Sequence, residues 1–503
     1  MEFEAETGIL ASSTPAGEAM GEDRLAARFL VLGVDILIAG AGAVMTFAAP
    51  RQLSPLYLGI CSALATTVVL AQVVYKATGT RPVNWLSVEV VALAMFWIVH
   101  FIYPLFWVLG WVESRDDIWF DTSIVCKANG MAVCGLGAFA AGYNFIADRY
   151  QQVRWENQLD PVSLKKWQYA GTGVFLLGAM TASTFLLLVG PQLFEGGYSV
   201  SWWGYVPKIV FLLTVNFLTL GFCLMTLSAT QLTGKWKIGI VPKIALLIIL
   251  AFMFVMGYRS LMLRLLVIVA AGYSEFVKRV SFKAMALVVL LALFLMAVGG
   301  VARESPRRTL SSFIDTAMDQ SSKITISRGV LELGSSVRTL YKAVEVVPDQ
   351  HDYFMGKLKV EEVASVVPFG NKLLETLGFQ SVNSAQFLTL AIYGDLQTGV
   401  GSSVFADVYL DFGFVGMILG MILLGWFCKY VQQRSRSSGA LTWCIAYTNL
   451  IAIMPHIARG SVLTLVREVL WPVALFLVIS FLFGIARRGV VAETEVANVE
   501  GIS

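Results

Sequence analysis

The sequence is poor in charge and lacks the motifs of nucleotide chemistry. Only 14% of its 503 residues are charged, whereas ordinary soluble domains carry roughly 25%, so a water-soluble fold is excluded. It contains no P-loop and no dinucleotide-binding fingerprint, which argues against an ATP-driven pump and against a cytoplasmic nucleotide-sugar domain. We expect neither a cofactor nor a nucleic-acid partner.

Metal-binding and secretory patterns are missing as well. The cysteines all lie in apolar segments, with no CxxC or His/Cys metal spacing, so we expect neither a disulfide framework nor a metal site. Residues 1–23 lack the basic start and apolar run of a secretory signal, and their small and acidic residues predict a disordered tail.

Long apolar stretches are what the sequence does contain. Hydrophobic residues make up 57% of the chain, and the mean hydropathy is +0.72. A helix needs about 17 to 25 residues to cross a ~30 Å hydrocarbon core. Twelve stretches fit this length, at 25–48, 53–75, 85–111, 122–146, 167–190, 204–231, 240–257, 260–277, 284–301, 403–428, 440–457 and 462–485. We therefore predict an all-α, polytopic integral membrane protein with about twelve transmembrane helices.

The positions of lysine and arginine predict the orientation of these helices, because cytoplasmic connections are enriched in both. With the amino terminus inside, most of these residues fall on one side of the membrane. Both termini are thus expected in the cytoplasm and the long polar loop outside. The expected units are a tail (1–23), nine transmembrane helices (24–301), a large external loop (302–402), three more helices (403–487) and a second tail (488–503).

The long loop shows the pattern of a surface helix. Apolar residues from Ile326 to Val344 recur at spacings of three and four, the period of an amphipathic helix. Arg328 and Arg338 fall off this stripe, and each is read most simply as a solvated cation. His351 follows in a turn, where a structural histidine is a more ordinary interpretation than a proton carrier.

The loop ends where the chain turns back into the membrane. Gly401 permits a close backbone approach, and Ser402 and Ser403 are suited to cap the next helix. The free N–H groups of such a helix start suit an anion, for example a diphosphate. Asp407 and Asp411 are four residues apart and so share one helix face. The alternative is an ordinary loop and cap, with both aspartates solvated in the headgroup layer.

Arginines near the outer ends of the expected spans add positive charge at this level. Arg259 and Arg264 lie at the external end of the eighth span, and Arg459 lies just before the twelfth. An arginine inside a bilayer costs roughly 2.5–3.5 kcal/mol on insertion scales, so such residues usually line a cavity or form a pair. A diphosphate site is one interpretation. For Arg467, an ion pair with Glu468 or with another span is an equally good one.

The order of these features resembles the Wzy-type O-antigen, or oligosaccharide repeat-unit, polymerases of bacterial inner membranes. That family is similar in having many spans, one large periplasmic loop late in the chain and a Gly-x-Gly-Ser segment running into a span. Asp411 departs from the family, which commonly has Asn there. The resembling segments, within about residues 240–485, are Gly257-Tyr258-Arg259-Ser260, Val347-Pro348 with Tyr353-Phe354-Met355-Gly356, Val367-Pro368, Gly399-Val400-Gly401-Ser402-Ser403 and Arg459-Gly460-Ser461.

The resemblance implies a glycosyltransferase of the bacterial inner membrane whose large loop is periplasmic. Such a polymerase moves a growing glycan from polyprenyl diphosphate onto a newly flipped lipid-linked repeat unit, without nucleotide or metal. The expected partners are polyprenyl-diphosphate-linked oligosaccharide as donor and acceptor, the lipid bilayer, and a chain-length regulating membrane protein.

The resemblance also suggests roles for the residues singled out above. We hypothesise that cations stabilise the leaving diphosphate and that a carboxylate or imidazole, either Asp407 or His351, deprotonates the acceptor hydroxyl. A glycan ligase using the same kind of donor and a transporter of lipid-linked oligosaccharide are the alternatives, although the internal repeats of transporters are not visible. The expected diphosphate-binding residues are Arg259, Arg264, Arg459, Arg328, Arg338, Gly401, Ser402 and Ser403.

Overall fold

The structure is a computed structural model that describes most of the chain. It covers residues 22–77, 83–113, 115–147, 161–190, 205–233, 240–255, 259–303, 318, 326–367, 370–378, 382–395, 399–438 and 440–482. Within these ranges the secondary structure is helical and contains no strand, which confirms the all-α prediction. Both expected tails fall almost wholly outside the described residues.

Each of the twelve expected spans is a helix. Eight of these helices, namely α1, α2, α3, α5, α6, α7, α17 and α19, are long and apolar enough to cross a membrane, so a polytopic membrane protein is confirmed. For the remaining four helices, the assignment as membrane spans stays a prediction; these are α8, α9, α10 and α18. The helices are α1 (Glu22–Phe47), α2 (Pro55–Ala77), α3 (Val88–Val108), α5 (Thr122–Phe145), α6 (Pro161–Val189), α7 (Tyr205–Thr233), α8 (Ile240–Val255), α9 (Arg259–Phe276), α10 (Phe282–Arg303), α17 (Val404–Ser438), α18 (Leu441–Ile457) and α19 (Val462–Leu482).

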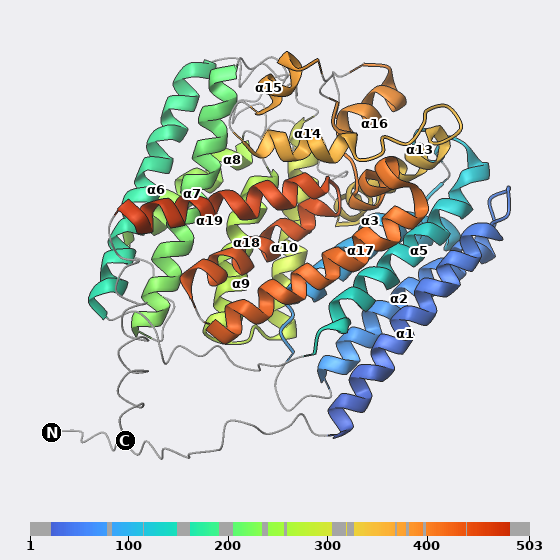
Figure 1. The fold of residues 1–503 in the computed structure, drawn as a ribbon, viewed down its shortest axis with the longest axis horizontal. Helices are drawn as coiled ribbons and strands as arrows, with labels where there is room; N and C mark the ends of the chain where they lie inside the picture. Colours follow the sequence, from blue (N-terminus) through green and yellow to red (C-terminus); the bar gives the residue numbers. More distant parts are fainter. Residues whose placement is uncertain are drawn as a thin grey trace.

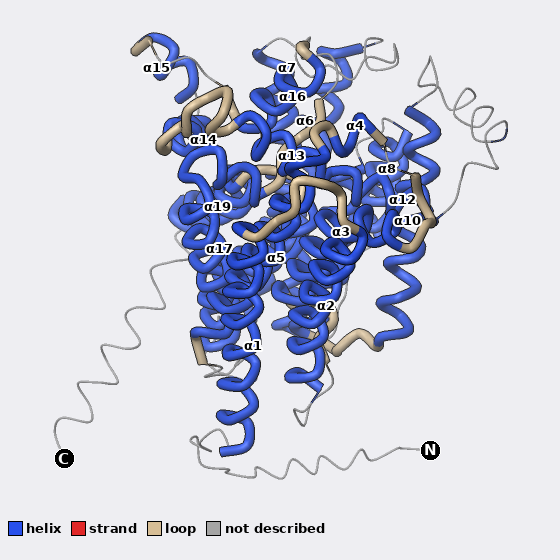
Figure 2. The backbone as a smooth tube through the Cα atoms, turned by 90° about the vertical axis from the view of Figure 1, so that its right-hand side faces the viewer, coloured by secondary structure: helices blue, strands red, loops and turns tan. Residues whose placement is uncertain are grey.

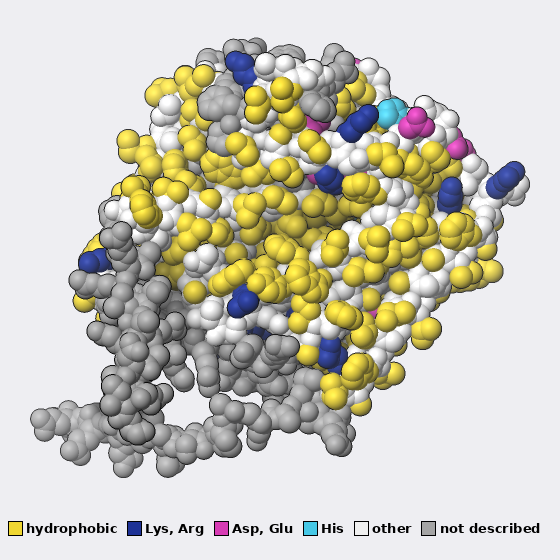
Figure 3. Space-filling view, in the orientation of Figure 1, with side chains coloured by type: hydrophobic (Ala, Val, Ile, Leu, Met, Phe, Trp, Pro, Cys, Tyr) yellow, Lys and Arg dark blue, Asp and Glu magenta, His cyan; other side chains and the backbone are white. Residues whose placement is uncertain are grey.

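The long helices form two groups that meet in the middle of the molecule. In Figure 1, α1, α2 and α5 run alongside α17 on one side, and α6 and α7 form a hairpin on the other. Close packing of α5 on α17 depends on glycine, because a Cβ at Gly425 would lie 2.1 Å from the carbonyl oxygen of Phe139. Hydrophobic side chains cover large, connected areas of the described surface in Figure 3, with few charged side chains among them, as expected of a surface that faces lipid.

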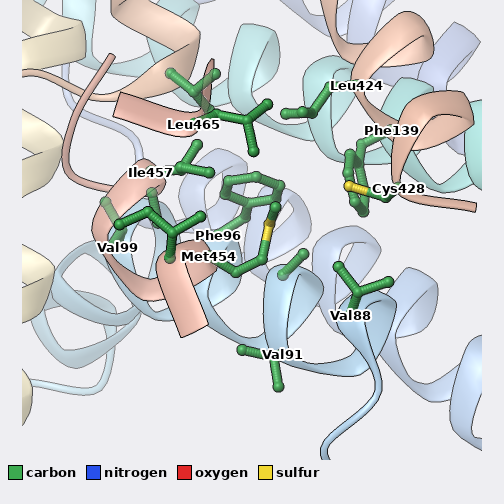
Figure 4. Close-up of a cluster of buried hydrophobic side chains, with 14 of the residues drawn as sticks. Val88, Val91, Phe96, Val99, Phe139, Leu424, Cys428, Met454, Ile457 and Leu465 are labelled. Carbon is green, nitrogen blue, oxygen red and sulfur yellow. The ribbon is translucent and has the colours of Figure 1, made fainter. Parts of the chain in front are cut away.

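A buried apolar cluster connects the two groups, because it includes Phe175 on α6 and Leu218 on α7 as well as residues of α5 and α17. Phe96 on α3 packs edge-on against Phe139 on α5, with ring centroids 5.2 Å apart, and also contacts Phe405 at the start of α17. Figure 4 shows the neighbouring side chains of this cluster, which come from α3, α5, α17, α18 and α19. The beginning of α17 is therefore held in the core of the bundle.

One end of α17 is also fixed by an ionic network. Glu275 near the end of α9 accepts hydrogen bonds from Arg436 Nε at 2.5 Å and from Arg279 Nη1 at 3.1 Å. Asn84, before α3, donates to the same carboxylate at 2.5 Å. Glu275 is 7% exposed, so these contacts compensate a buried charge and tie α17 to α9.

Short helices occupy the long loop. The amphipathic stripe from Ile326 to Val344 forms α12 (Ile326–Gly334) and α13 (Arg338–Val346), joined by a 3₁₀ turn at Ser335–Val337. The loop continues with α14 (Lys357–Val366), α15 (Gly370–Thr376) and α16 (Ser384–Tyr393). Figures 1 and 2 both place α13 to α16 together at one end of the bundle, opposite the first turn of α1.

Candidate functional site

The start of α17 is capped and pressed against the turn before α19. Ser403 Oγ accepts a hydrogen bond from the Ala406 N–H at 3.2 Å, which is an N-cap interaction. The Ser402 N–H points to the Arg459 carbonyl oxygen at 3.4 Å. Gly401 has φ +75°, and a Cβ there would lie 3.0 Å from the same carbonyl oxygen, so only glycine fits easily. The structure thus brings Gly401, Ser402 and Ser403 together with the backbone of Arg459.

The helix α17 breaks at Gly413, where φ is 67° and ψ is −162°. The break separates a short segment, residues 404–412, which we call the half helix, from the long remainder of α17. It also frees carbonyl groups for other partners. Leu410 O accepts from the Phe354 N–H at 3.0 Å, and Asp411 O accepts from the Met355 N–H at 2.9 Å.

Asp407 lies at the meeting point of two helix starts. Its side chain is fully buried, in the first turn of the half helix. Oδ2 accepts hydrogen bonds from the Val462 N–H at 3.0 Å, which is the start of α19, and from Lys359 Nζ at 2.5 Å. Oδ1 has no hydrogen-bond partner within the described ranges. Helix amino termini stabilise negative charge, so this position favours a carboxylate.

Asp411 is buried in the same pocket of polar groups and caps α14. Its Oδ1 accepts from the Gly356 N–H at 3.1 Å and from the Leu358 N–H at 3.3 Å. Its Oδ2 lies 3.5 Å from Lys359 Nζ. Both Asp407 and Asp411 are 0% exposed, so the alternative in which they are solvated in the headgroup layer is wrong.

Lys359 and Glu362 complete the site, and sequence reasoning missed both. They are three residues apart on α14, with Nζ 2.9 Å from Glu362 Oε2. No motif in the sequence marks them, because their role is visible only in the structure, where α14 exposes Val360 and Val363 and buries Glu362, the reverse of an ordinary surface helix. Two large apolar side chains facing outward suggest that the polar side of the helix faces the protein.

The charges of this site influence one another. Burial, together with the nearby charge of Asp407, raises the pKa of Glu362 to about 8, although Lys359 acts in the opposite direction. Burial would lower the pKa of Lys359, but the charges of Asp407 and Glu362 outweigh it and raise that pKa above its ordinary value. The site therefore holds a charged ammonium, and the charge of Asp407 disfavours ionisation of Glu362 beside it.

Arg264 forms an internal ion pair. It is 4% exposed, and its guanidinium contacts the carboxylate of Glu468 on α19. Nη2 also donates to Asn449 Oδ1 at 3.2 Å and to the Glu468 carbonyl oxygen at 3.0 Å. Arg467 Nη2 lies 3.2 Å from Glu468 Oε1, in agreement with the ion pair that was one interpretation of Arg467 from the sequence.

The other predicted residues lie elsewhere. Arg338 donates to Tyr393 Oη at 3.1 Å and lies over its ring, 5.7 Å from the centroid. His351 is exposed and stacks on Phe354 with centroids 4.6 Å apart, and among the described residues it contacts Asp352 and Phe387 rather than Asp407. The side chains of Arg259 and Arg328 lie outside the described part of the structure.

The arrangement suits proton transfer and anion binding. A buried carboxylate with one unpartnered oxygen can accept a proton, and the adjoining helix starts can hold an anion. In the part of the chain that the structure describes, no group of three His, Cys, Asp or Glu side chains is arranged to hold a metal ion.

Comparison with known proteins gives a family. No match was found among curated proteins or among solved structures. The family model of the O-antigen polysaccharide polymerase Wzy matches residues 36–487, which include every helix after α1 and the whole site described above. Because this match extends over most of the 503 residues, the chain belongs to the Wzy family of O-antigen polysaccharide polymerases.

Proposed function

We propose that this protein is a glycan polymerase of the bacterial inner membrane, with both termini in the cytoplasm. It transfers a growing polysaccharide from polyprenyl diphosphate to a new polyprenyl-diphosphate-linked repeat unit at the periplasmic face, without metal or nucleotide. Family membership supports polymerisation, and the buried carboxylate of Asp407 supports the proposed chemistry.

Asp407 is the proposed general base. The acceptor hydroxyl gives its proton to Oδ1 while its oxygen forms the new bond to the anomeric carbon of the donor sugar. The bond from that carbon to the diphosphate breaks, and the diphosphate leaves with the electron pair. Asp407 fits this role better than His351, because the imidazole Nδ1 of His351 already lies 2.5 Å from the Asp352 carbonyl oxygen and the ring is exposed.

The diphosphate is proposed to bind beside the half helix. Gly401, Ser402 and Ser403 form its start next to Arg459, and Arg259, Arg328 and Arg338 are proposed as further cations. Arg264 can take part only by releasing Glu468. Positive charge placed where the leaving group develops negative charge lowers the barrier.

Access to Asp407 requires a local movement. The side chain is 0% exposed, and Lys359 on α14 and the Val462 N–H on α19 cover Oδ2. We infer that the acceptor reaches Oδ1 when the half helix and α14, joined through Lys359 and Asp407, shift together about Gly413.

Elongation by purified protein tests this function. A lipid-diphosphate-linked repeat unit is incubated with the protein in detergent, with chelator and without nucleotide, and the products are sized. We expect elongation by the wild type and a loss of about 10²–10⁴-fold in Asp407→Asn, the range for a general base. Asp117→Asn, which alters an exposed aspartate paired with Arg115, is the control and should elongate normally.

Other results of these experiments would support a different base or a different function. Full activity of Asp407→Asn removes this residue as the base. Transfer of glycan only to an unrelated acceptor indicates a ligase. Movement of the lipid-linked unit across vesicles without lengthening indicates a transporter.

A further inference from the structure

One ammonium group contacts three carboxylates in the site. Lys359 Nζ lies 2.5 Å from Asp407 Oδ2, 2.9 Å from Glu362 Oε2 and 3.5 Å from Asp411 Oδ2. We call these three carboxylates the acidic cluster. Their side chains are 0%, 3% and 0% exposed, respectively, so the ammonium is the cation on which three buried acids converge.

A second lysine pair shows that this is not an ordinary helix contact. Lys342 and Glu345 on α13 have the same spacing of three residues and the same separation of 2.9 Å. Their side chains are 15% and 18% exposed, so water shares in their solvation. Lys359 itself is 23% exposed, but the three carboxylates are only 0–3% exposed, and acids buried without a cation would be strongly destabilising.

Both ends of α14 are fixed, so the position of Lys359 is set by the fold. At the start of α14, Asp411 Oδ1 accepts from the Gly356 and Leu358 N–H groups. At its end, Trp471 Nε1 on α19 donates to the Val366 carbonyl oxygen at 3.0 Å. The helix α14 thus bridges α17 and α19 and places Lys359 beside the half helix.

We propose that Lys359 is the resident cation of the acidic cluster, a positioning residue that pairs with Asp407 and orients it in the place where a divalent metal ion would otherwise be needed. This inference rests on the proposed function and deepens it, since it assigns the residue that controls the base. Asp407 Oδ1 is buried and unpartnered in the described structure, and the ammonium contacts only Oδ2, so Oδ1 remains for the acceptor hydroxyl once the site opens.

The distances from Lys359 Nζ to the three carboxylates predict that a cation-binding site would form if the ammonium were removed. Oxygen ligands surround Ca²⁺ at about 2.3–2.6 Å. At the Nζ position, one carboxylate oxygen already lies at 2.5 Å and the others at 2.9 and 3.5 Å, so each must move by less than about 1 Å to reach that range. Lys359→Ala should therefore turn the acidic cluster into a site for a hard divalent cation.

The experiment compares wild type, Lys359→Ala and the matched control Lys342→Ala in the elongation assay, with chelator and in titrations of Ca²⁺, Mg²⁺ and Mn²⁺. We expect wild type and Lys342→Ala to be insensitive to the chelator. Lys359→Ala in chelator should lose about 10–100-fold, as when a supporting residue of a site is removed, and should recover with saturable cation dependence. Lys359→Arg, which keeps the charge, should elongate without added cation.

Binding is measured independently of activity. Because a ligand stabilises the folded state that binds it, Ca²⁺ should raise the Tm of Lys359→Ala and leave that of the wild type unchanged. If Lys359→Ala aggregates, purification in millimolar Ca²⁺ should yield folded protein. Aggregation despite Ca²⁺, Mg²⁺ and Mn²⁺, or a folded protein whose activity and Tm ignore all three, overturns the proposal.

The two proposals fail in different ways. Wild-type protein that does not elongate refutes the proposed function, whereas cation binding by Lys359→Ala would still support the resident ammonium. Full activity of Lys359→Ala in chelator, alongside an active wild type, refutes only the role of Lys359.

Discussion

The ion pair between Arg264 and Glu468 gives a prediction that can be worked through quantitatively. The two side chains are 4% and 6% exposed, so Arg264→Met leaves a carboxylate in an apolar interior. Breaking a buried pair costs about 3–5 kcal/mol. Arg467 keeps its contact with Glu468, so we expect the lower end, about 3 kcal/mol. An unfolding entropy of about 2.1 cal/mol/K per residue gives ~1 kcal/mol/K for a chain of this size, so the loss lowers the Tm by roughly 3 °C.

Removing both charges should restore most of the stability. Arg264→Met combined with Glu468→Met places apolar side chains where the pair was, and such replacements are often neutral. Arg467 is left without Glu468, but it is 33% exposed and can reach water. The double variant should therefore lie within about 1 kcal/mol of the wild type, which corresponds to a coupling of at least about 2 kcal/mol.

Thermal unfolding in detergent measures this coupling, and elongation by the double variant tests the diphosphate proposal for Arg264. If the two substitutions are additive, the ion pair is not a stabilising unit and the reasoning is refuted. A stable double variant that elongates normally would remove Arg264 from the diphosphate site. A stable but inactive one would support its role there.

Three further predictions concern stability. The folded-state pKa of Glu362 is raised to about 8. The stabilisation of the fold by the protonated Glu362 side chain is therefore full at acidic pH and is lost as pH rises through 8. Between pH 6 and 9, the Tm of Glu362→Gln should fall less than the Tm of the wild type or of Glu345→Gln. Gly413→Ala should cost about 1–3 kcal/mol, because φ +67° with ψ −162° is a conformation that essentially only glycine adopts. Gly173→Ala, with open space around its Cβ, should be tolerated, and equal Tm values would contradict this. Ser403→Ala should cost about 1 kcal/mol through its lost cap, and an unchanged Tm would rule out that contribution.

Local patterns predicted the helices and the start of α17. Long apolar stretches are sufficient to give helices at all twelve expected ranges, because each pattern depends on neighbours along the chain. The cap at Ser403 and the shared face of Asp407 and Asp411 follow from spacing alone in the same way.

Contacts between distant segments could not be predicted from the sequence. Gly413 stands within a continuous apolar pattern, and its break depends on backbone pairing with Phe354 and Met355. Lys359 reaches Asp407 across 48 positions, and Arg264 reaches Glu468 across 204. Such pairs arise from packing, whereas the sequence could suggest only the adjacent pair of Arg467 and Glu468.

The break at Gly413 divides α17 mechanically. The long part is anchored by the glycine contact of Gly425 with α5 and by Arg436, which is bonded to Glu275 on α9. The half helix is attached to the loop through Leu410 and Asp411 and to the core through Phe405. A shift of Asp407 together with α14 is therefore taken up at Gly413, while the long part of α17 keeps its contacts with α5 and α9.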